Sequence, residues 1–344
     1  MSAHAAAPAD AARARRLTEW VLRVRELGIV AALALLIAVT AAIEPRFIEA
    51  ASLRNLALNA SIFAILAVGQ TLVIITRNVD LSAGSVLGLS AFFAGDLLQS
   101  NPDLTLPVVF LLGIALGAAC GLLNGVLVTW GQVPALVVTL GTLYAFRGLA
   151  FLWTEGRQVN AETLPDAFLD LGSDSIAGVP ILVIIALVVV FAFGQWLRDY
   201  RAGRELYAIG SNPEGARLAG VRSNRRVLVA FVLAGGLAGL GGVLFTARFG
   251  TVDATAGVGY ELTVIAAAVV GGVAIFGGTG TVYGAALGAL LLGSITSSLI
   301  VLRVAAFWQM AAIGALLLVA IALDRFVAIR IEAALRRRSA RRAD

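Results

Sequence analysis

The chain has 344 residues, of which 60% are hydrophobic and only 14% are charged, and its mean hydropathy is +0.93. Soluble domains are about 45–50% apolar and about 25% charged, so this composition excludes an ordinary soluble fold. At about 20 residues per membrane-spanning helix, ten helices leave too little chain for a second globular domain.

Residue types that commonly carry chemistry are scarce in this sequence. The chain has 26 arginines, no lysine, one histidine (His4) and one cysteine (Cys120). A nucleotide-binding P-loop requires its lysine, a Schiff base requires an amine, and histidine dyads and zinc sites require more histidine or cysteine. One cysteine forms no intrachain disulfide. We therefore expect no catalytic residue, no metal site and no cofactor bound by this chain.

Ten apolar segments predict an all-α integral membrane protein with ten transmembrane helices. In chain order they cover residues 27–43, 57–75, 81–98, 106–129, 136–153, 179–197, 227–246, 261–276, 281–299 and 306–323. They form one transmembrane domain over 27–323, between an N-terminal tail, 1–26, and a basic C-terminal tail, 324–344. The first segment also has features of a signal peptide, with small residues near Thr40, but its length favours a retained helix.

The arginines indicate how the chain is oriented. With the N-terminus in the cytoplasm, 20 of the 26 arginines fall on the cytoplasmic side and five on the other, while Arg147 lies within a helix. Cytoplasmic loops of membrane proteins carry an excess of arginine and lysine. We therefore expect both termini in the cytoplasm and a multi-pass membrane protein surrounded by lipid. The basic charge is explained by topology, and we expect no nucleic-acid partner.

Polar residues gather between the second and third apolar segments. Residues 69–85 read GQTLVIITRNVDLSAGS, and the polar side chains nearest membrane depth include Gln70, Thr71, Asn78 and Asp80. Such groups are costly in a bilayer and mark function or helix contacts. Two interpretations are open: a short irregular break capped by Ser82 or Asp80, or a broken segment lining a polar cavity. In either case Arg77 and Asp80 are suited to pair.

A second polar cluster lies inside the fifth apolar segment, where Thr139 and Thr142 can share one helix face. Arg147 follows on the same segment. An arginine at this depth faces protein or water, or extends to the interface. The sequence leaves open whether Arg147 anchors the outer interface or lines the route of a polar solute.

Glycines recur every fourth residue in two apolar segments, which favours close helix packing. They are Gly113, Gly117, Gly121 and Gly125 in the fourth segment and Gly280, Gly284 and Gly288 at the start of the ninth. If segments 2–5 and 7–10 are two repeats, each stripe lies on the third helix of its repeat. Because segments 2 and 7 cross in opposite senses, the pattern predicts two inverted repeats, a common transporter plan.

One large cytoplasmic loop spans residues 198–226. A turn is predicted over 210–213, followed by a short helix that starts near Pro213, has Glu214 in its first turn and ends at Gly220. The small residues Ala216, Ala219 and Gly220 suit insertion into a groove of a partner, although a solvated connector also fits the composition. We expect Ala216 at the partner contact.

Four stretches of this sequence resemble the permease subunits of bacterial ATP-binding-cassette (ABC) importers for monosaccharides such as ribose, xylose and rhamnose. They are GRELYAIGSNPEGARLAGV (203–221), TRNVDLSAGSVLGLSA (76–91), VPALVVTLGTLYAFRGLAFLWTEG (133–156) and VIAAAVVGGVAIFGGTGTVYGAALGALLLG (264–293). The resemblance extends from about residue 30 to 325. The TRNVDLSAGS run and LIVLRVAAFWQ (299–309) are most similar to rhamnose and autoinducer-2 importer permeases. Ala83 and Ala219 depart from the commoner Val and Ser.

The resemblance implies a transport subunit of the bacterial inner membrane. It implies that this subunit works with a second permease copy or paralogue, two ATPase subunits that use ATP and magnesium, and a periplasmic sugar-binding protein. It implies that residues 203–221 form the coupling loop that docks on the ATPase, with Gly203, Arg204, Ala208, Gly210, Asn212, Ala216 and Gly220 at the contact. The side chains expected to line the solute pathway are Gln70, Thr71, Asn78, Asp80, Asn124, Thr142 and Arg147.

An ion-coupled secondary transporter is the main alternative function, since it also moves small polar solutes. Such a transporter needs carboxylates within its helices, and only Asp96 lies well inside a predicted segment, near its outer end. A membrane-embedded enzyme would need a nucleophile, a base or a metal cluster. Neither the sugar nor the choice between homodimer and heterodimer follows from the sequence.

Overall fold

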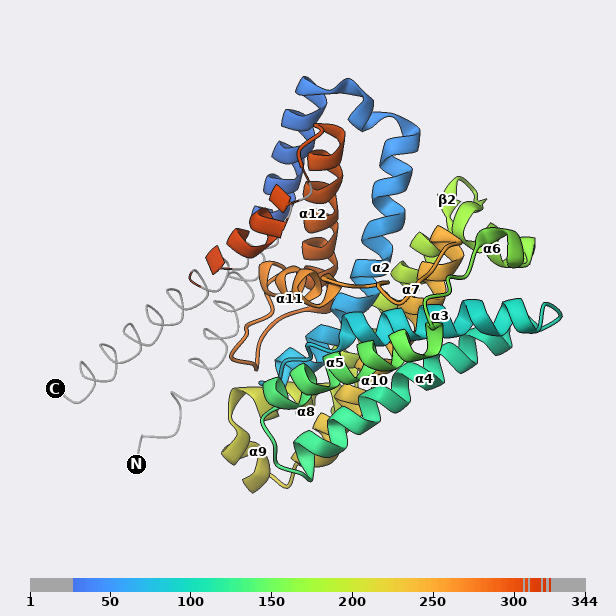
Figure 1. Cartoon of the computed structure of the whole chain (residues 1–344). Helices are drawn as coiled ribbons and strands as arrows, with labels where there is room; N and C mark the ends of the chain where they lie inside the picture. The colour runs from blue at the N-terminus through green and yellow to red at the C-terminus, as the bar shows by residue number, and fades with distance from the viewer. Residues whose placement is uncertain (1–26, 306, 309, 317, 320–321, 323–344) are drawn as a thin grey trace, which may run out of the picture.

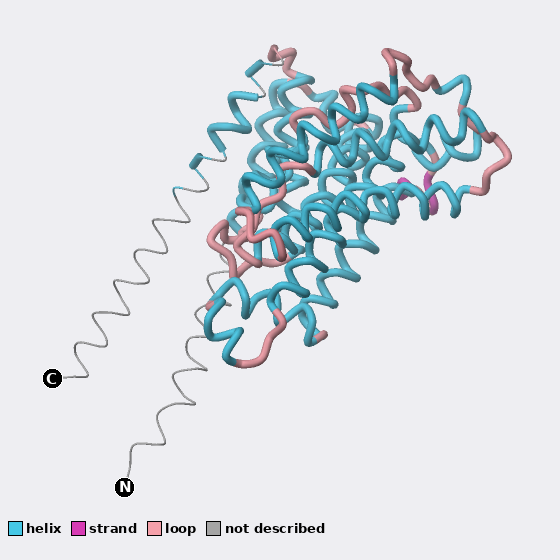
Figure 2. The backbone as a smooth tube through the Cα atoms, turned by 60° about the horizontal axis from the view of Figure 1, so that its bottom comes forward, coloured by secondary structure: helices cyan, strands magenta, loops and turns pink. Residues whose placement is uncertain are grey.

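A computed structural model describes residues 27–305, 307–308, 310–316, 318–319 and 322 of the chain. Helices dominate these residues (Figures 1 and 2). After a first helix, Leu27–Ile43, the helices in chain order are η1 (Pro45–Ile48), α2 (Ala50–Ile75), α3 (Ala83–Ser100), α4 (Leu106–Thr129), α5 (Ala135–Thr154), η2 (Ala161–Thr163), α6 (Asp166–Ser173), α7 (Ile181–Asp199), α8 (Arg201–Ser211), α9 (Pro213–Leu218), α10 (Ser223–Phe249), α11 (Tyr260–Val270) and α12 (Val282–Val301).

Six of the described helices, namely α2, α4, α5, α7, α10 and α12, are long and apolar enough to cross a membrane. The first helix and α11 are shorter, although both coincide with predicted segments. The predicted segment 261–276 ends early, because Gly271 and Gly272 begin a turn and several following glycines have positive φ. Segment 306–323 is only partly covered by the described residues, and both tails lie outside them.

Two helices form the centre of the molecule. Most of α2 and α10 is buried, whereas α4, α5 and α7 expose most of their apolar side chains. A helix that is apolar on all sides is typically buried in protein or lipid, and the exposed faces of α4, α5 and α7 suit a lipid surrounding or a partner in the membrane.

The packing around these two central helices is reciprocal. Helix α4 lies along α10, α12 lies along α2, and the two central helices contact each other (Figure 1). The shorter helices show the same pattern: α3 packs on α10, and α11 packs on α2. Each central helix is thus covered by helices from the opposite half of the chain.

The loop between α5 and α7 closes one end of the molecule. It contains α6 and an antiparallel pair of two-residue strands, β1 (Ser175–Ile176) and β2 (Val179–Pro180); Figure 2 shows how small this pair is beside the helices. A β-bridge joins Val159 to Val252, so the loop is held against the connection between α10 and α11. The α8–α9 segment (residues 201–220) lies near the start of α10, where Arg226 bonds to Glu205. The loop between α5 and α7 lies near the end of α10, where Gly172 meets Ala247.

Candidate functional site

The α8–α9 segment combines one predicted helix with one that was missed. The prediction of a short helix from Pro213 is confirmed: the Asn212 side chain accepts a hydrogen bond from the Gly215 N–H at 2.9 Å, and Gly220 has φ +78°. These are ordinary start and stop features of a helix. Helix α8 was not predicted, although Leu206 and Ile209 give it a buried face at helical spacing.

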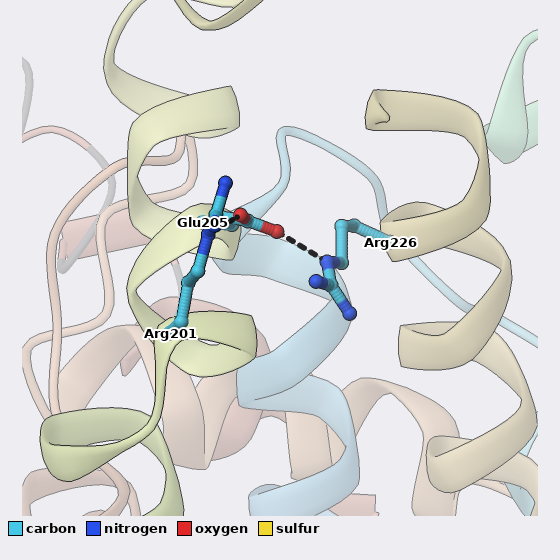
Figure 3. Close-up of polar contacts among 3 residues, drawn as sticks. All are labelled: Arg201, Glu205 and Arg226. Carbon is cyan, nitrogen blue, oxygen red and sulfur yellow. Dashed lines mark hydrogen bonds and ion pairs between the residues drawn. The ribbon is translucent and has the colours of Figure 1, made fainter. Parts of the chain in front are cut away.

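An ion-pair cluster fixes α8 to the start of α10. Glu205 of α8 lies between two arginines, as Figure 3 shows. One carboxylate oxygen accepts a hydrogen bond from Arg201 Nε at 2.7 Å, and the other accepts one from Arg226 Nε. Burial raises the pKa of Glu205, but the hydrogen bonds and positive charges of Arg201 and Arg226 outweigh burial and hold this pKa below its usual value. The cluster therefore contains an ionised carboxylate at neutral pH.

The C-terminal end of α8 is bonded to the polar break between α2 and α3. The Arg77 guanidinium donates to the Gly210 carbonyl, and its Nη2 donates to the Ser211 carbonyl at 3.0 Å. Arg77 itself has φ +67°, an unusual conformation for a residue with a side chain. The expected Arg77–Asp80 pair is wrong, because Asp80 instead accepts hydrogen bonds from the Ser82 N–H and hydroxyl.

The same end of α8 also contacts the turn between α11 and α12. The Tyr207 hydroxyl donates to the Gly280 carbonyl at 2.8 Å, and Ser211 Oγ donates to the Gly278 carbonyl at 3.3 Å. The Gly278 N–H donates to the Ile75 carbonyl, which ends α2. A side chain at Gly278 would collide with Ser211. Helix α8 therefore touches both irregular segments at this end of the molecule.

The seven residues expected at the ATPase contact divide into two groups. Arg204, Ala208, Asn212 and Gly220 are exposed, whereas Gly203, Gly210 and Ala216 are buried. Arg204 donates to the carbonyls of Arg198 and Asp199 at the end of α7.

Ala216 lies inside the chain's own core rather than on its surface. It is only 5% exposed and belongs to a cluster with Val73, Val227 and Phe231. This burial contradicts the expectation that Ala216 contacts a partner. Leu218, two positions further along α9, is instead 81% exposed, and sequence reasoning did not single it out.

The polar residues of the break form a buried cluster. Asn124 of α4 donates to Ser82 Oγ at 2.8 Å, and Ser82 in turn donates to Asp80. With its side-chain amide in the orientation that satisfies both its N and its O, Gln70 of α2 donates to the Asp80 carbonyl and accepts from the Asp80 N–H. Asn124 Oδ1 is buried and has no hydrogen-bond partner among the described residues. These side chains join α2, the break and α4, and within the described chain they are enclosed.

The other expected pathway residues are placed differently. Thr71 and Thr142 are buried and bond to backbone of their own helices, and the half-buried Asn78 bonds to Thr76. Arg147 reaches the connection between α10 and α11, where Nη1 donates to the Ala254 carbonyl at 3.0 Å and also to the Ala256 carbonyl. Whether any of these side chains lines a pathway stays a prediction.

Two further acidic side chains, besides Asp96, bear on whether the chain could carry a coupling ion. Asp80 is 2% exposed. Glu261, in the first turn of α11, accepts from the Gly259 N–H through Oε1, and its buried Oε2 has no hydrogen-bond partner among the described residues. Asp96 lies 3.8 Å from Arg157 in a partly exposed ion pair. Among the described residues, no group of three or more His, Cys, Asp or Glu side chains is arranged to hold a metal ion.

The glycines of α4 lie against α10. A Cβ at Gly117 or Gly121 would collide with backbone of α10, and one at Gly113 or Gly125 would meet its side chains. In the second stripe, Gly284 and Gly288 face the backbone at the end of α11.

Gly280 is not part of the second stripe. It precedes α12, lies in the turn and has φ +132°. Its expected place on the helix is therefore wrong, because the turn requires its backbone conformation instead.

Comparison with known proteins identifies relatives over most of the chain. Residues 52–321 match the family described as the permease component of the branched-chain amino acid transport system. The autoinducer 2 import system permease protein LsrC of Salmonella choleraesuis (strain SC-B67) is 37% identical over 313 residues, which cover 91% of this chain and 89% of that protein. LsrC of Escherichia coli (strain K12 / DH10B) is 38% identical over 314 residues, covering 91% and 90%. No solved structure matches the chain.

These relatives agree with the composition and the helices. The relatives are permease proteins and not enzymes, and six described helices suit a bilayer. The protein is a multi-pass protein of the inner membrane, and the resemblance to ABC importer permeases is confirmed. The chain belongs to the permease component family of the branched-chain amino acid transport system type.

Proposed function

We propose that this chain is the membrane-spanning permease subunit of an ABC importer that moves a monosaccharide or a similar small polar solute, such as autoinducer-2, from the periplasm to the cytoplasm. The family match and the LsrC relatives support this proposal. In it, a partner ATPase binds and hydrolyses ATP with magnesium, a periplasmic binding protein delivers the solute, and a second permease subunit completes the pathway.

The proposed architecture is a ten-helix permease built from two inverted repeats, with both termini in the cytoplasm. The reciprocal packing supports it, because exchanging α2 with α10, α3 with α11 and α4 with α12 maps one set of helix contacts onto the other. Inverted repeats place a pathway at the repeat interface and allow one half to rock against the other. The arginine distribution supports a cytoplasmic position for the α8–α9 segment.

One observation carries the proposed mechanism: α8 is bonded to both irregular segments at its end of the molecule. Arg77 joins it to the break after α2, and Tyr207 joins it to the turn before α12. A partner that moves the α8–α9 segment therefore acts directly on one connection inside each repeat. Closure of an ATPase dimer that favours one position of this segment would shift the population between inward-open and outward-open states.

The test is solute uptake by proteoliposomes that contain the permease, the ATPase and the binding protein. Uptake of the solute carried by the cognate binding protein should require ATP. Replacing Arg77 with Gln removes the charged contacts to α8, so ATP hydrolysis should continue while uptake falls severalfold. The exposed Arg157→Gln is the matched control and should leave uptake unchanged. Uptake without ATP, or full coupling in Arg77→Gln, would contradict the proposal.

An ion-coupled secondary transporter is the second candidate. The observations that favour it are the buried Asp80 and the half-buried Glu261, whose Oε2 is buried without a hydrogen-bond partner among the described residues. Carboxylates within helices are typical carriers of a coupling ion or proton. Proteoliposomes that hold the permease alone, with a proton or sodium gradient and no ATP, distinguish the two candidates. Gradient-driven uptake that is lost in Asp80→Asn would favour this candidate over the importer.

A further inference from the structure

A pocket of about 290 Å³ lies at the end of α10, in the connection between α10 and α11. This connection, drawn in orange in Figure 1, runs from the end of α10 past α2 to α11. The pocket is far along α10 from the α8–α9 segment, so the proposed orientation opens it to the periplasm. None of the expected pathway residues lines it.

The rim of the pocket is polar. Asp253 Oδ1 accepts from the Thr255 N–H at 2.8 Å and from the Thr255 hydroxyl at 2.6 Å. Asp253 is exposed, and in the described part of the chain nothing bonds to its second oxygen or to the Thr251 hydroxyl. A fixed carboxylate with one free oxygen beside a free hydroxyl is suited to accept hydrogen bonds from adjacent hydroxyl groups of a ligand.

The other wall of the pocket is aromatic. It contains Phe245 and Tyr260, whose ring centroids are 6.0 Å apart. Tyr260 also packs on Phe63 of α2, with centroids 4.6 Å apart. Rings held in this way offer a flat face to the C–H groups of a small ring or polyol, while the carboxylate side binds its hydroxyl groups.

The connection that carries these groups is held by its neighbours. Arg147 of α5 donates to the Ala254 and Ala256 carbonyls, and the Val159–Val252 bridge holds the first part of the connection. A Cβ at Gly257 would collide with the Gly84 carbonyl of α3. The pocket is thus preformed, and an occupant would touch a connection that contacts both α3 and α5.

We infer that this pocket binds the transported solute directly, and that the solute is a small neutral molecule with adjacent hydroxyl groups. Asp253 accepts hydrogen bonds from the hydroxyl pair, Thr251 adds a third polar contact, and Phe245 and Tyr260 cover the apolar face. This inference rests on the proposed import function, and it adds a selecting site in the membrane subunit.

The test is ligand-observed saturation-transfer NMR on the full-length chain in lipid nanodiscs, without partner subunits. D-ribose is the probe, and tetrahydrofuran is the control ring without hydroxyl groups. Saturation should transfer to D-ribose and not to tetrahydrofuran. Asp253→Asn keeps an oxygen for the turn with Thr255 but loses the negative charge, so it should weaken D-ribose binding about tenfold, the order expected for a lost charge-assisted hydrogen bond.

Asp103→Asn, which changes an exposed acid at the same end of the molecule, is the matched control and should bind D-ribose normally. Equal binding by Asp253→Asn and the native chain, or no transfer to D-ribose at all, would overturn the inference. Proteoliposome uptake distinguishes this outcome from failure of the proposed function. ATP-driven uptake that is unchanged in Asp253→Asn would refute only the solute-binding pocket, whereas uptake that does not require ATP would refute only the importer.

Discussion

Two side chains of α9, only two positions apart, have opposite surroundings. Ala216 is packed in the chain's own core, while Leu218 projects from the surface of the α8–α9 segment. A single exposed leucine is ordinary on a protein surface. Here it is the last residue of a helix that the proposed mechanism places against an ATPase, where an apolar side chain fills a partner's groove.

Replacing Leu218 with Asp should therefore abolish ATP-driven uptake while leaving the thermal unfolding midpoint unchanged. The charged side chain remains in water in the free permease but cannot enter an apolar groove. Co-purification of the ATPase subunits with the permease measures the contact, and Leu218→Met is the conservative control. Ala216→Arg should instead lower the unfolding midpoint, because it places a charge in a packed core. A Leu218→Asp variant that retains the ATPase would refute this docking site.

The Glu205 cluster predicts how stability depends on pH. Its folded-state pKa is depressed, so the carboxylate stabilises the fold above its ordinary pKa of 4.5, and this contribution is lost as pH falls through the lower folded-state value. Glu205→Gln should lower the unfolding midpoint by a few degrees at pH 7, and the difference from the native chain should shrink below pH 4.5. Fluorescence-monitored unfolding in detergent measures both.

Glu214→Gln is the control for that experiment, since Glu214 is exposed and its side chain takes part in no ion pair among the described residues. Its unfolding midpoint should follow that of the native chain at every pH. A Glu205→Gln difference that stays constant down to pH 3 would contradict the assignment of the effect to ionisation.

Helix α4 can approach α10 closely because its facing positions lack side chains. Gly117 of α4 and Gly235 of α10 face each other, and a Cβ on either would collide with the other's carbonyl. Such close contacts supply packing between helices where lipid leaves little hydrophobic driving force. Gly141 of α5 is different, since nothing lies within 4 Å of the position its Cβ would take.

Gly117→Ala should therefore destabilise the protein by about 1–3 kcal/mol, the usual cost of overpacking a core. Gly141→Ala adds the same methyl group in an open position and should be neutral or stabilising by about 0.4–1 kcal/mol, because alanine restricts the unfolded chain. Thermal unfolding in a fixed detergent compares the two variants. Equal midpoints would show that α4 can move away from α10 at little cost.

Elements with strong local signals were predictable, and those fixed by distant contacts were not. Apolar runs predicted α4 and α5 within one residue, and Pro213, Glu214 and Gly220 predicted α9. The end of α11 depends on a glycine turn that also bonds to α8, and the partner of Arg77 lies more than a hundred residues away. Ala216 was misplaced for the same reason, because its burial depends on Val73 and Phe231 from other helices.

At the scale of the whole molecule, the two halves of the described chain cover each other's central helix. That reciprocity, with α4 on α10 and α12 on α2, is what two repeats of opposite orientation require. The arginines predict which end of the molecule faces the cytoplasm. Seven of them lie between residues 198 and 226 at the α8–α9 end, and arginine-rich loops are usually retained on the cytoplasmic side.

Single cysteines test this orientation, since the buried Cys120 is the only native cysteine. In a Cys120→Ala background, Arg217→Cys in α9 and Ser175→Cys in β1 place exposed thiols at opposite ends of the molecule. A membrane-impermeant maleimide should label Ser175→Cys in intact spheroplasts and Arg217→Cys only after lysis. Labelling of a denatured sample is the control that shows both thiols to be reactive. The reverse labelling pattern would place the α8–α9 segment outside the cytoplasm, where no ATPase could reach it.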